Sequence, residues 1–103
     1  MRTVQAVYLG LDLGTSGCRA AAFTEGGELV ASARRPVETR RPAPGRAEQE
    51  PLDWERAAAA ALQEVVARLR AAGEPGVVRE VRSLTLTGQM AGLVLVDRAG
   101  ANP

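Results

Sequence analysis

The chain has 103 residues, of which 46% are hydrophobic, 24% charged and 3% aromatic, and its 13 basic and 12 acidic side chains leave a net charge of +1. This length suits one domain, while the apolar fraction is too high for a disordered chain and the balanced charge gives no field that would steer nucleic acid. Because the chain has no histidine and one cysteine, Cys18, it excludes within itself a serine–histidine–aspartate triad, a histidine general base, an internal disulfide and a zinc cluster.

Three β-strands joined by tight turns are predicted for the first third of the chain. Residues 6–13 (AVYLGLDL) are apolar on both alternating faces except for Asp12, a pattern typical of a central strand that is covered on both sides. A two-glycine turn leads into a second strand at residues 18–24, and another turn leads into a third at residues 28–34, expected at a sheet edge or with one face in water. Since these connections are short, neighbouring strands are expected to be antiparallel.

A proline-rich loop and a long helix follow. Residues 35–50 contain three prolines and several arginines, and a solvated surface loop is favoured over an anion-binding patch. Pro51 suits the first position of a helix, apolar residues at helical spacing continue from Trp54 to Ala72, and Gly73 ends the helix. Trp54 is expected to be a core anchor rather than a platform for a ligand.

Two more strands are predicted for the last part of the chain. Residues 81–87 (VRSLTLT) form a fourth strand, residues 88–92 interrupt it, and residues 93–97 (LVLVD) form a fifth. A helix between the third and fourth strands suits an α/β fold in which the helix packs on one face of the sheet. The expected mixed sheet has five strands in the order 3-2-1-4-5, with strand four parallel to strand one and strand two antiparallel to its neighbours.

Groups suited to phosphate chemistry are concentrated at the end of the first strand. Asp12 would be desolvated there, which is expensive for a carboxylate unless a cation such as magnesium meets it. The turn and the following strand add backbone N–H groups, hydroxyls and a guanidinium, all suited to phosphate oxygens; these residues are Gly14, Thr15, Ser16, Gly17 and Arg19. The alternative is a plain hairpin turn in which Asp12 is only a turn acceptor, and the residues by themselves favour neither.

Other nucleotide and nucleic-acid sites fit less well. A Walker P-loop needs a lysine, which the chain lacks, and the dinucleotide glycine motif opens a helix, whereas a strand follows here. Ribonuclease-H-like nucleases share the order of elements but need an acid at the end of the fourth strand to hold two metals. This chain has Thr87 and Gln89 there, which favours a nucleotide-binding relative of the same architecture.

Three ordered motifs resemble those of one protein family. Residues 8–17 (YLGLDLGTSG) resemble the first phosphate motif of the actin-like ATPase superfamily and, more narrowly, of the FGGY carbohydrate kinases. Residues 47–51 (AEQEP) with Trp54 are similar to the EQDPxxW segment that opens the first helix in that family. Residues 87–97 (TGQMAGLVLVD) are similar to the GQMHG…LLD segment of xylulokinases.

The resemblance implies a ribonuclease-H-like or actin-like ATPase half-domain, with residues 1–103 as the N-terminal part of the first domain of a sugar kinase. The general base and the second, ATP-binding lobe would lie outside it. Asp12 would orient magnesium and the transferred phosphoryl group, and the phosphates would lie against Gly14, Thr15, Ser16, Gly17 and Arg19. The sugar would lie against Gln89, Met90 and Ala91, although a core position at a strand end is an equal alternative for Met90.

The chain departs from the xylulokinase pattern in two places. Ala91 stands where those enzymes carry a histidine against the sugar, and Glu50 stands where aspartate is usual. Because a methyl group cannot form the hydrogen bond of an imidazole, the identity of the sugar stays open.

The implied function is ATP-dependent transfer of phosphate to a hydroxyl of a ketose or polyol of xylulose type, with ATP and magnesium as cofactors. The alternative is a truncated, non-catalytic module that binds phosphate or self-associates. A sugar and ATP are the expected partners rather than nucleic acid or a membrane, and a homo-oligomer is compatible with the sequence. No apolar run approaches the roughly 20 residues of a membrane helix, and the lone cysteine favours a reducing compartment, so a cytoplasmic location is expected.

Overall fold

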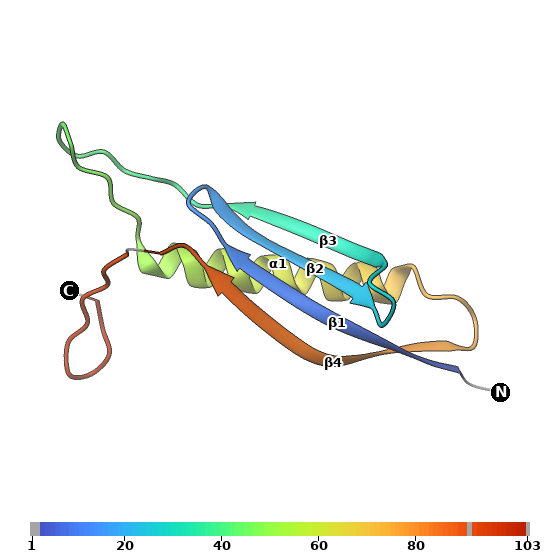
Figure 1. Ribbon diagram of the computed structural model, residues 1–103. Coiled ribbons are helices and arrows are strands. Elements are labelled where there is room, and N and C mark those ends of the chain that lie inside the picture. Colours follow the sequence, from blue (N-terminus) through green and yellow to red (C-terminus); the bar gives the residue numbers. More distant parts are fainter. Residues whose placement is uncertain (1–2, 91, 103) are drawn as a thin grey trace.

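The fold is a twisted mixed sheet with one long helix across one of its faces (Figure 1). A computed structural model describes residues 3–90 and 92–102. The elements are β1 (Thr3–Leu13), β2 (Gly17–Thr24), β3 (Leu29–Pro36), α1 (Pro51–Ala71) and β4 (Val77–Gly88). The four strands lie in the order β3-β2-β1-β4, with β2 antiparallel to both neighbours and β4 parallel to β1. In the ranges that the structure describes, no helix has the length and apolar character needed to cross a membrane.

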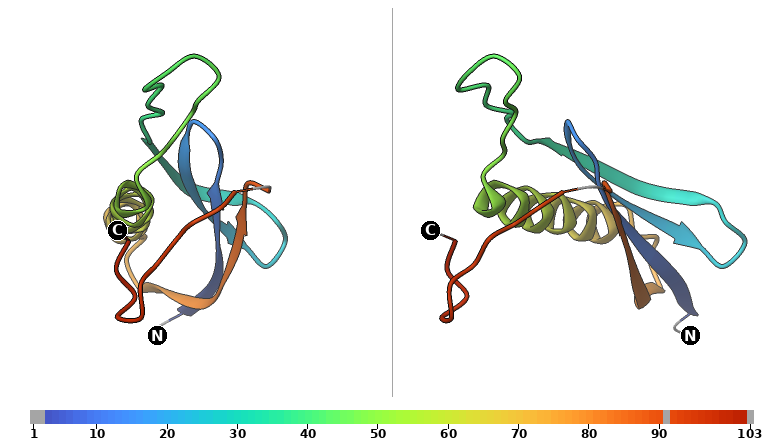
Figure 2. Two further views of the ribbon diagram at one scale, coloured as in Figure 1. Left: turned by 90° about the vertical axis from the view of Figure 1, so that its left-hand side faces the viewer. Right: turned by 60° about the vertical axis from the view of Figure 1, so that its left-hand side comes forward.

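The central position of β1 is confirmed, but its expected cover on both faces is wrong. Val7 and Leu9 are buried on the face toward α1, whereas Asp12, on the opposite face, is exposed. The reason is that the single described helix packs on one side of the sheet only, as Figure 2 shows in end view. The apolar residues of β1 on the other face, Ala6 and Tyr8, are therefore only half-buried.

The core lies between α1 and the strands β1, β2 and β3. One helix stripe, spaced four residues apart, is buried: Ala57, Ala61, Val65 and Leu69. The last three of these meet small strand side chains such as Ala20, Ala22 and Ala33, and Ala57 packs with Cys18 and Val37. Alanines let the helix approach the sheet closely. The predicted amphipathic helix is thus confirmed, with its start at Pro51 as expected.

The C-terminal end of α1 is held by β4. The Arg79 guanidinium donates from Nη1 to the Leu69 carbonyl at 2.9 Å and from Nε to Gln5 Oε1 at 2.9 Å. Such a cation at a helix C-terminus satisfies a carbonyl that has no partner within the helix. The helix ends at Ala71, one residue before the end predicted from the sequence.

The expected fifth strand at residues 93–97 is wrong, and the described sheet has four strands. The segment leaves the edge strand β4 and runs toward the start of α1 (Figure 2). The end of this segment forms a local turn instead, in which Asp97 Oδ1 accepts hydrogen bonds from the backbone N–H groups of Ala99 and Ala101 at 2.9 and 2.8 Å. Leu93 is 82% exposed, so no layer here covers the apolar side chains that an added strand would present.

The loop between β3 and α1 extends away from the sheet (Figure 1). It folds back through a bridge between Arg40 and Glu48, and Arg46 pairs with Glu48 at 2.6 Å. This backbone bridge and the exposed ion pair support a solvated loop rather than an anion patch. The loop also contributes to an elongated shape, with a radius of gyration of 17.0 Å against about 13 Å for a compact domain of 100 residues.

Candidate functional site

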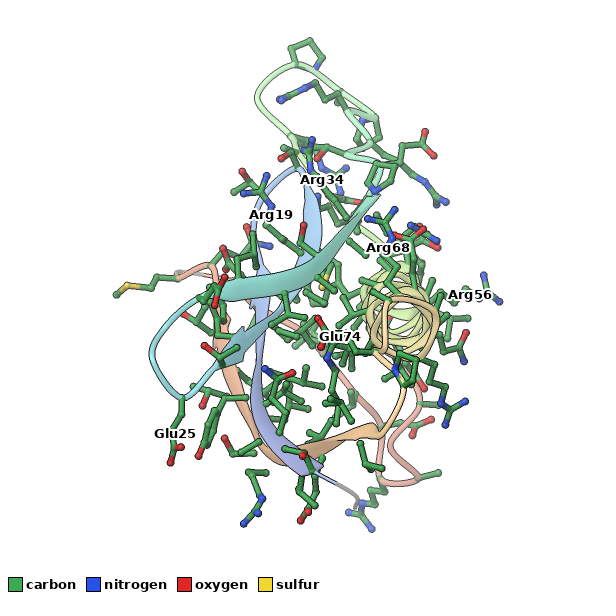
Figure 3. The ribbon with its side chains drawn as sticks, turned by 90° about the vertical axis from the view of Figure 1, so that its right-hand side faces the viewer. Arg19, Glu25, Arg34, Arg56, Arg68 and Glu74 are labelled. Carbon is green, nitrogen blue, oxygen red and sulfur yellow. The ribbon has the colours of Figure 1, made fainter. Side chains whose placement is uncertain are left out.

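A row of polar residues crosses the sheet on the face opposite α1. The strand register pairs Arg34 with Arg19, Arg19 with Asp12, and Asp12 with Thr87. Directly paired residues of neighbouring strands point to the same face, so these four side chains share the open face beside the turn at residues 14–16. Figure 3 shows Arg19 and Arg34 at the same end of the sheet.

Asp12 is exposed in this row, contrary to the expectation of a desolvated carboxylate. The difference follows from the one-sided cover of β1, since Asp12 points away from the helix. In the parts of the chain with described structure, no three acidic, histidine or cysteine side chains cluster as they would in an all-protein metal site. A single carboxylate fits magnesium nevertheless, because this ion binds through one or two carboxylates, waters and phosphate oxygens.

The turn between β1 and β2 is tighter than the amide array expected from its sequence. The Gly14 N–H donates to the Gly17 carbonyl at 2.9 Å, and the Ser16 carbonyl accepts from the Val37 N–H at 3.1 Å. Thr15 and Ser16 form the exposed tip. An anion would therefore meet the amides and hydroxyls of these two residues rather than a continuous run from Gly14 to Gly17.

Strand packing requires a glycine at position 17. A Cβ placed on it would lie 2.4 Å from the Arg35 carbonyl oxygen and 3.0 Å from the Pro36 Cα, whereas a Cβ on Gly14 would meet only the Gly17 carbonyl, at 3.6 Å. Real side chains do not tolerate the first distance. The close passage of β3 is therefore a reason for a glycine at position 17 that does not depend on a ligand, and the phosphate role expected for Gly14 and Gly17 stays a prediction.

Arg34 is a candidate site residue that the sequence patterns did not indicate. Its Nη2 donates to Ser16 Oγ at 3.1 Å, so a second guanidinium lies at the tip of the turn beside Arg19. A bulge between Ala22 and Phe23 shifts the pairing of β2 with β3 by one residue. Counting back from the turn at residues 25–27 without that bulge would have placed Arg34 on the helix face.

An open groove of about 860 Å³ lies between the turn, the start of α1 and the segment after β4. Thr15, Gln89 and Met90 all line it, which brings one predicted phosphate residue together with two predicted sugar residues. Met90 is 91% exposed, so its alternative as a core residue is wrong. Ala91, the third predicted sugar residue, lies outside the described residues.

Trp54 both packs and lines this groove. Its ring lies half-buried against the cluster of Cys18, Val37 and Ala57, which confirms the predicted packing role. Its Nε1 donates to Gln49 Oε1 at 2.9 Å. The sequence indicated Gln49 only as part of the motif at residues 47–51 and gave no role for its side chain. The contacts of that side chain come from segments far apart in the chain.

Cys18 is fully buried beneath the polar row. Burial raises the pKa of its thiol above the usual value, and the nearby Asp12 carboxylate raises it further. The thiol is therefore held protonated and acts as a small apolar side chain in the packing, not as a nucleophile.

Comparisons with known proteins agree on one family. Residues 7–103 match the family model described as the FGGY family of carbohydrate kinases, N-terminal domain. The chain is 38% identical over 93 residues to the xylulose kinase of Klebsiella pneumoniae, covering 90% of this chain and 18% of that protein. It is 30% identical over 98 residues to the glycerol kinase of Aquifex aeolicus, covering 95% and 18%.

Solved structures give the same result. The crystal structure of xylulose kinase from Rhodospirillum rubrum superposes with a TM-score of 0.82 and 33% identity, covering 94% of this chain and 19% of that one. The chain thus spans about a fifth of the length of the relatives it matches.

Proposed function

This chain belongs to the FGGY family of carbohydrate kinases, and we propose that it forms the N-terminal part of the first domain of an ATP-dependent kinase acting on a hydroxyl of a ketose or polyol. The adenosine pocket and the general base would belong to the rest of that enzyme, called here the full-length kinase. The observation that carries the proposal is the contact of the turn at residues 14–16 with the groove through Thr15. Donor phosphates and acceptor sugar can therefore meet at one end of the sheet.

The polar row and the turn tip form the phosphate side. Asp12 would hold magnesium together with phosphate oxygens, and Thr15 and Ser16 would donate hydrogen bonds to those oxygens. Arg19 and Arg34 add two guanidinium groups, whose planar forks suit phosphate. Magnesium, when bound, would neutralise part of the phosphate charge, and catalysis in such transfers rests on positioning and electrostatic stabilisation.

The groove forms the acceptor side. Gln89 and Met90 line it, and Ala91 follows in the chain. A xylulose-type sugar is the substrate class proposed, with the Ala91 methyl removing one hydrogen bond that an imidazole would make. If so, Ala91→His in the full-length kinase should shift the ratio of kcat/KM values toward D-xylulose over other sugars. An unchanged ratio would count against a role of this position in sugar choice.

The proposal is tested by titrating ATP and magnesium into the full-length kinase by calorimetry. Asp12→Ala and Asp12→Asn should weaken uptake at least about 10-fold, since each removes the carboxylate that meets the metal. Asp53→Asn, which changes an acid on α1 that pairs with Arg56 at 3.9 Å, is the matched control and should bind as the unaltered protein does. Uptake that is the same in all variants would refute the phosphate role of Asp12. A cytoplasmic location belongs to the same proposal, because ATP is the donor.

A further inference from the structure

One amide side chain connects the turn at residues 14–16 to the groove. Gln49 Nε2 donates to the Thr15 carbonyl at 2.7 Å and to Thr39 Oγ1 at 3.0 Å. Its Oε1 accepts from Trp54 Nε1 at 2.9 Å and from Gln89 Nε2 at 3.3 Å. The four partners come from the turn, the loop after β3, the helix and the segment after β4, so this single group contacts every wall of the groove.

The chemistry of the contacts requires an amide. Two of the partners accept, through a carbonyl and a hydroxyl oxygen, and two donate, through an indole and an amide N–H. Only a carboxamide offers two donors and an acceptor oxygen at the end of one flexible side chain. A carboxylate of the same shape would keep the acceptor side and would place an oxygen against the Thr15 carbonyl instead of a donor.

We propose that Gln49 is a positioning residue, which holds the phosphate-binding tip at Thr15 at a fixed place relative to the sugar-binding residue Gln89. The inference rests on the proposed kinase function and adds a residue to it that touches neither the reacting atoms nor the metal. Gln89 is fixed from a second direction, because its backbone N–H donates to the Leu13 carbonyl at 2.8 Å. Hydrogen bonds thus connect the end of β1 through Gln89 and the Gln49 amide to the tip of the turn at Thr15.

The consequence for catalysis follows from the distances that phosphoryl transfer requires. The acceptor hydroxyl and the phosphorus must lie within near-attack range, and a displacement of about 1 Å can cost on the order of 100-fold in rate. Loss of the Gln49–Thr15 bond would let the tip move relative to the groove while each substrate keeps most of its own contacts. The expected defect is therefore in kcat, with smaller changes in KM for ATP and for sugar.

The test uses Gln49→Glu in the full-length kinase, assayed with ATP, magnesium and D-xylulose well below the melting temperature. We expect kcat to fall roughly 10- to 100-fold while both KM values change less. The matched control is Gln5→Glu at the opposite end of β1. There the side chain accepts from Arg79, a bond that a carboxylate keeps, so the control should retain kcat.

A second variant addresses the case in which Gln49→Glu does not fold. Trp54→Phe keeps an aromatic ring in the packing, although a smaller one, and removes the indole donor to Gln49 Oε1. We expect a smaller loss of kcat in the same direction. A folded Gln49→Glu or Trp54→Phe variant with unaltered kcat, or one that loses only melting temperature, would overturn the positioning role. Absence of sugar-dependent ATP turnover in the unaltered kinase would instead overturn the proposed function.

Discussion

The sharpest test of the fold around the turn is Gly17→Ala. The added Cβ would lie 2.4 Å from the Arg35 carbonyl oxygen and 3.0 Å from the Pro36 Cα. Both obstacles are backbone atoms of β3, which cannot rotate away as a side chain could. The end of β3 must therefore move, and the adjoining bond from the Val37 N–H to the Ser16 carbonyl, 3.1 Å long, is strained or lost.

The size of the effect can be worked out from these contacts. Overpacking a close contact costs about 1–3 kcal/mol, and loss of one backbone hydrogen bond adds about 1 kcal/mol. The free energy of unfolding should therefore fall by about 2–4 kcal/mol. For a domain near 100 residues each kcal/mol lowers the melting temperature by about 4–8 °C, so a decrease of about 10 °C or more is expected.

The assay is thermal unfolding of the purified chain at low protein concentration, followed by far-ultraviolet circular dichroism. Gly14→Ala is the matched control, because its Cβ would meet only ordinary contact at 3.6 Å. Gly10→Ala has open space, with nothing within 4 Å, and should be neutral or stabilise by about 0.4–1 kcal/mol through the unfolded state. If Gly17→Ala melts together with Gly14→Ala, the close passage of β3 is refuted.

Three further outcomes are expected. The Cys18 thiol should resist an aromatic disulfide reagent until the chain unfolds. Because the pKa of this thiol is raised in the folded state, the stability that the thiol contributes is complete below the unfolded pKa of about 8.5 and is lost as pH rises above that value. A melting temperature that does not fall above this pH contradicts the prediction. Arg34→Gln in the full-length kinase should raise KM for ATP roughly 10-fold and leave KM for sugar unchanged, since it removes the charge-assisted contact that we propose between Arg34 and phosphate. Equal changes in both KM values would argue against this contact. We expect the isolated chain to self-associate through uncovered apolar side chains of β4, and Leu84→Ser with Leu86→Ser, at positions 46% and 66% exposed, should lower its light scattering at little cost in stability. Scattering that is unchanged by the two substitutions would contradict this contact.

Much of the fold could be predicted from the chain because its patterns are local. The helix was recognisable from apolar residues spaced three and four apart and from Pro51 at its start, and both features act within one or two turns of backbone. The antiparallel strands followed from short connections around glycine turns. The turn that we propose to bind phosphate could be predicted as a unit because Asp12, Thr15 and Ser16 are close in sequence, so their proximity needs no tertiary information.

The composition of the site depended on contacts between distant segments. A single bulge in the pairing of β2 with β3 places Arg34 on the open face, and a shift of one residue moves every side chain of a strand to the other face. Gln49 acquires its role from partners 34 and 40 positions away, Thr15 and Gln89. No pattern within a helix or strand encodes such a meeting.

What the sequence by itself determined was the order of the first four strands and the helix, the start of the helix at Pro51, and the family motifs along the chain. Tertiary structure alone decided which of those faces is covered. One helix reaches β1, β2 and β3 but leaves β4 at the edge, so Asp12 faces solvent and residues 93–97 form no strand. The physical reason is that burial is a property of a surface and its neighbour together, and the neighbour is specified by residues elsewhere in the chain.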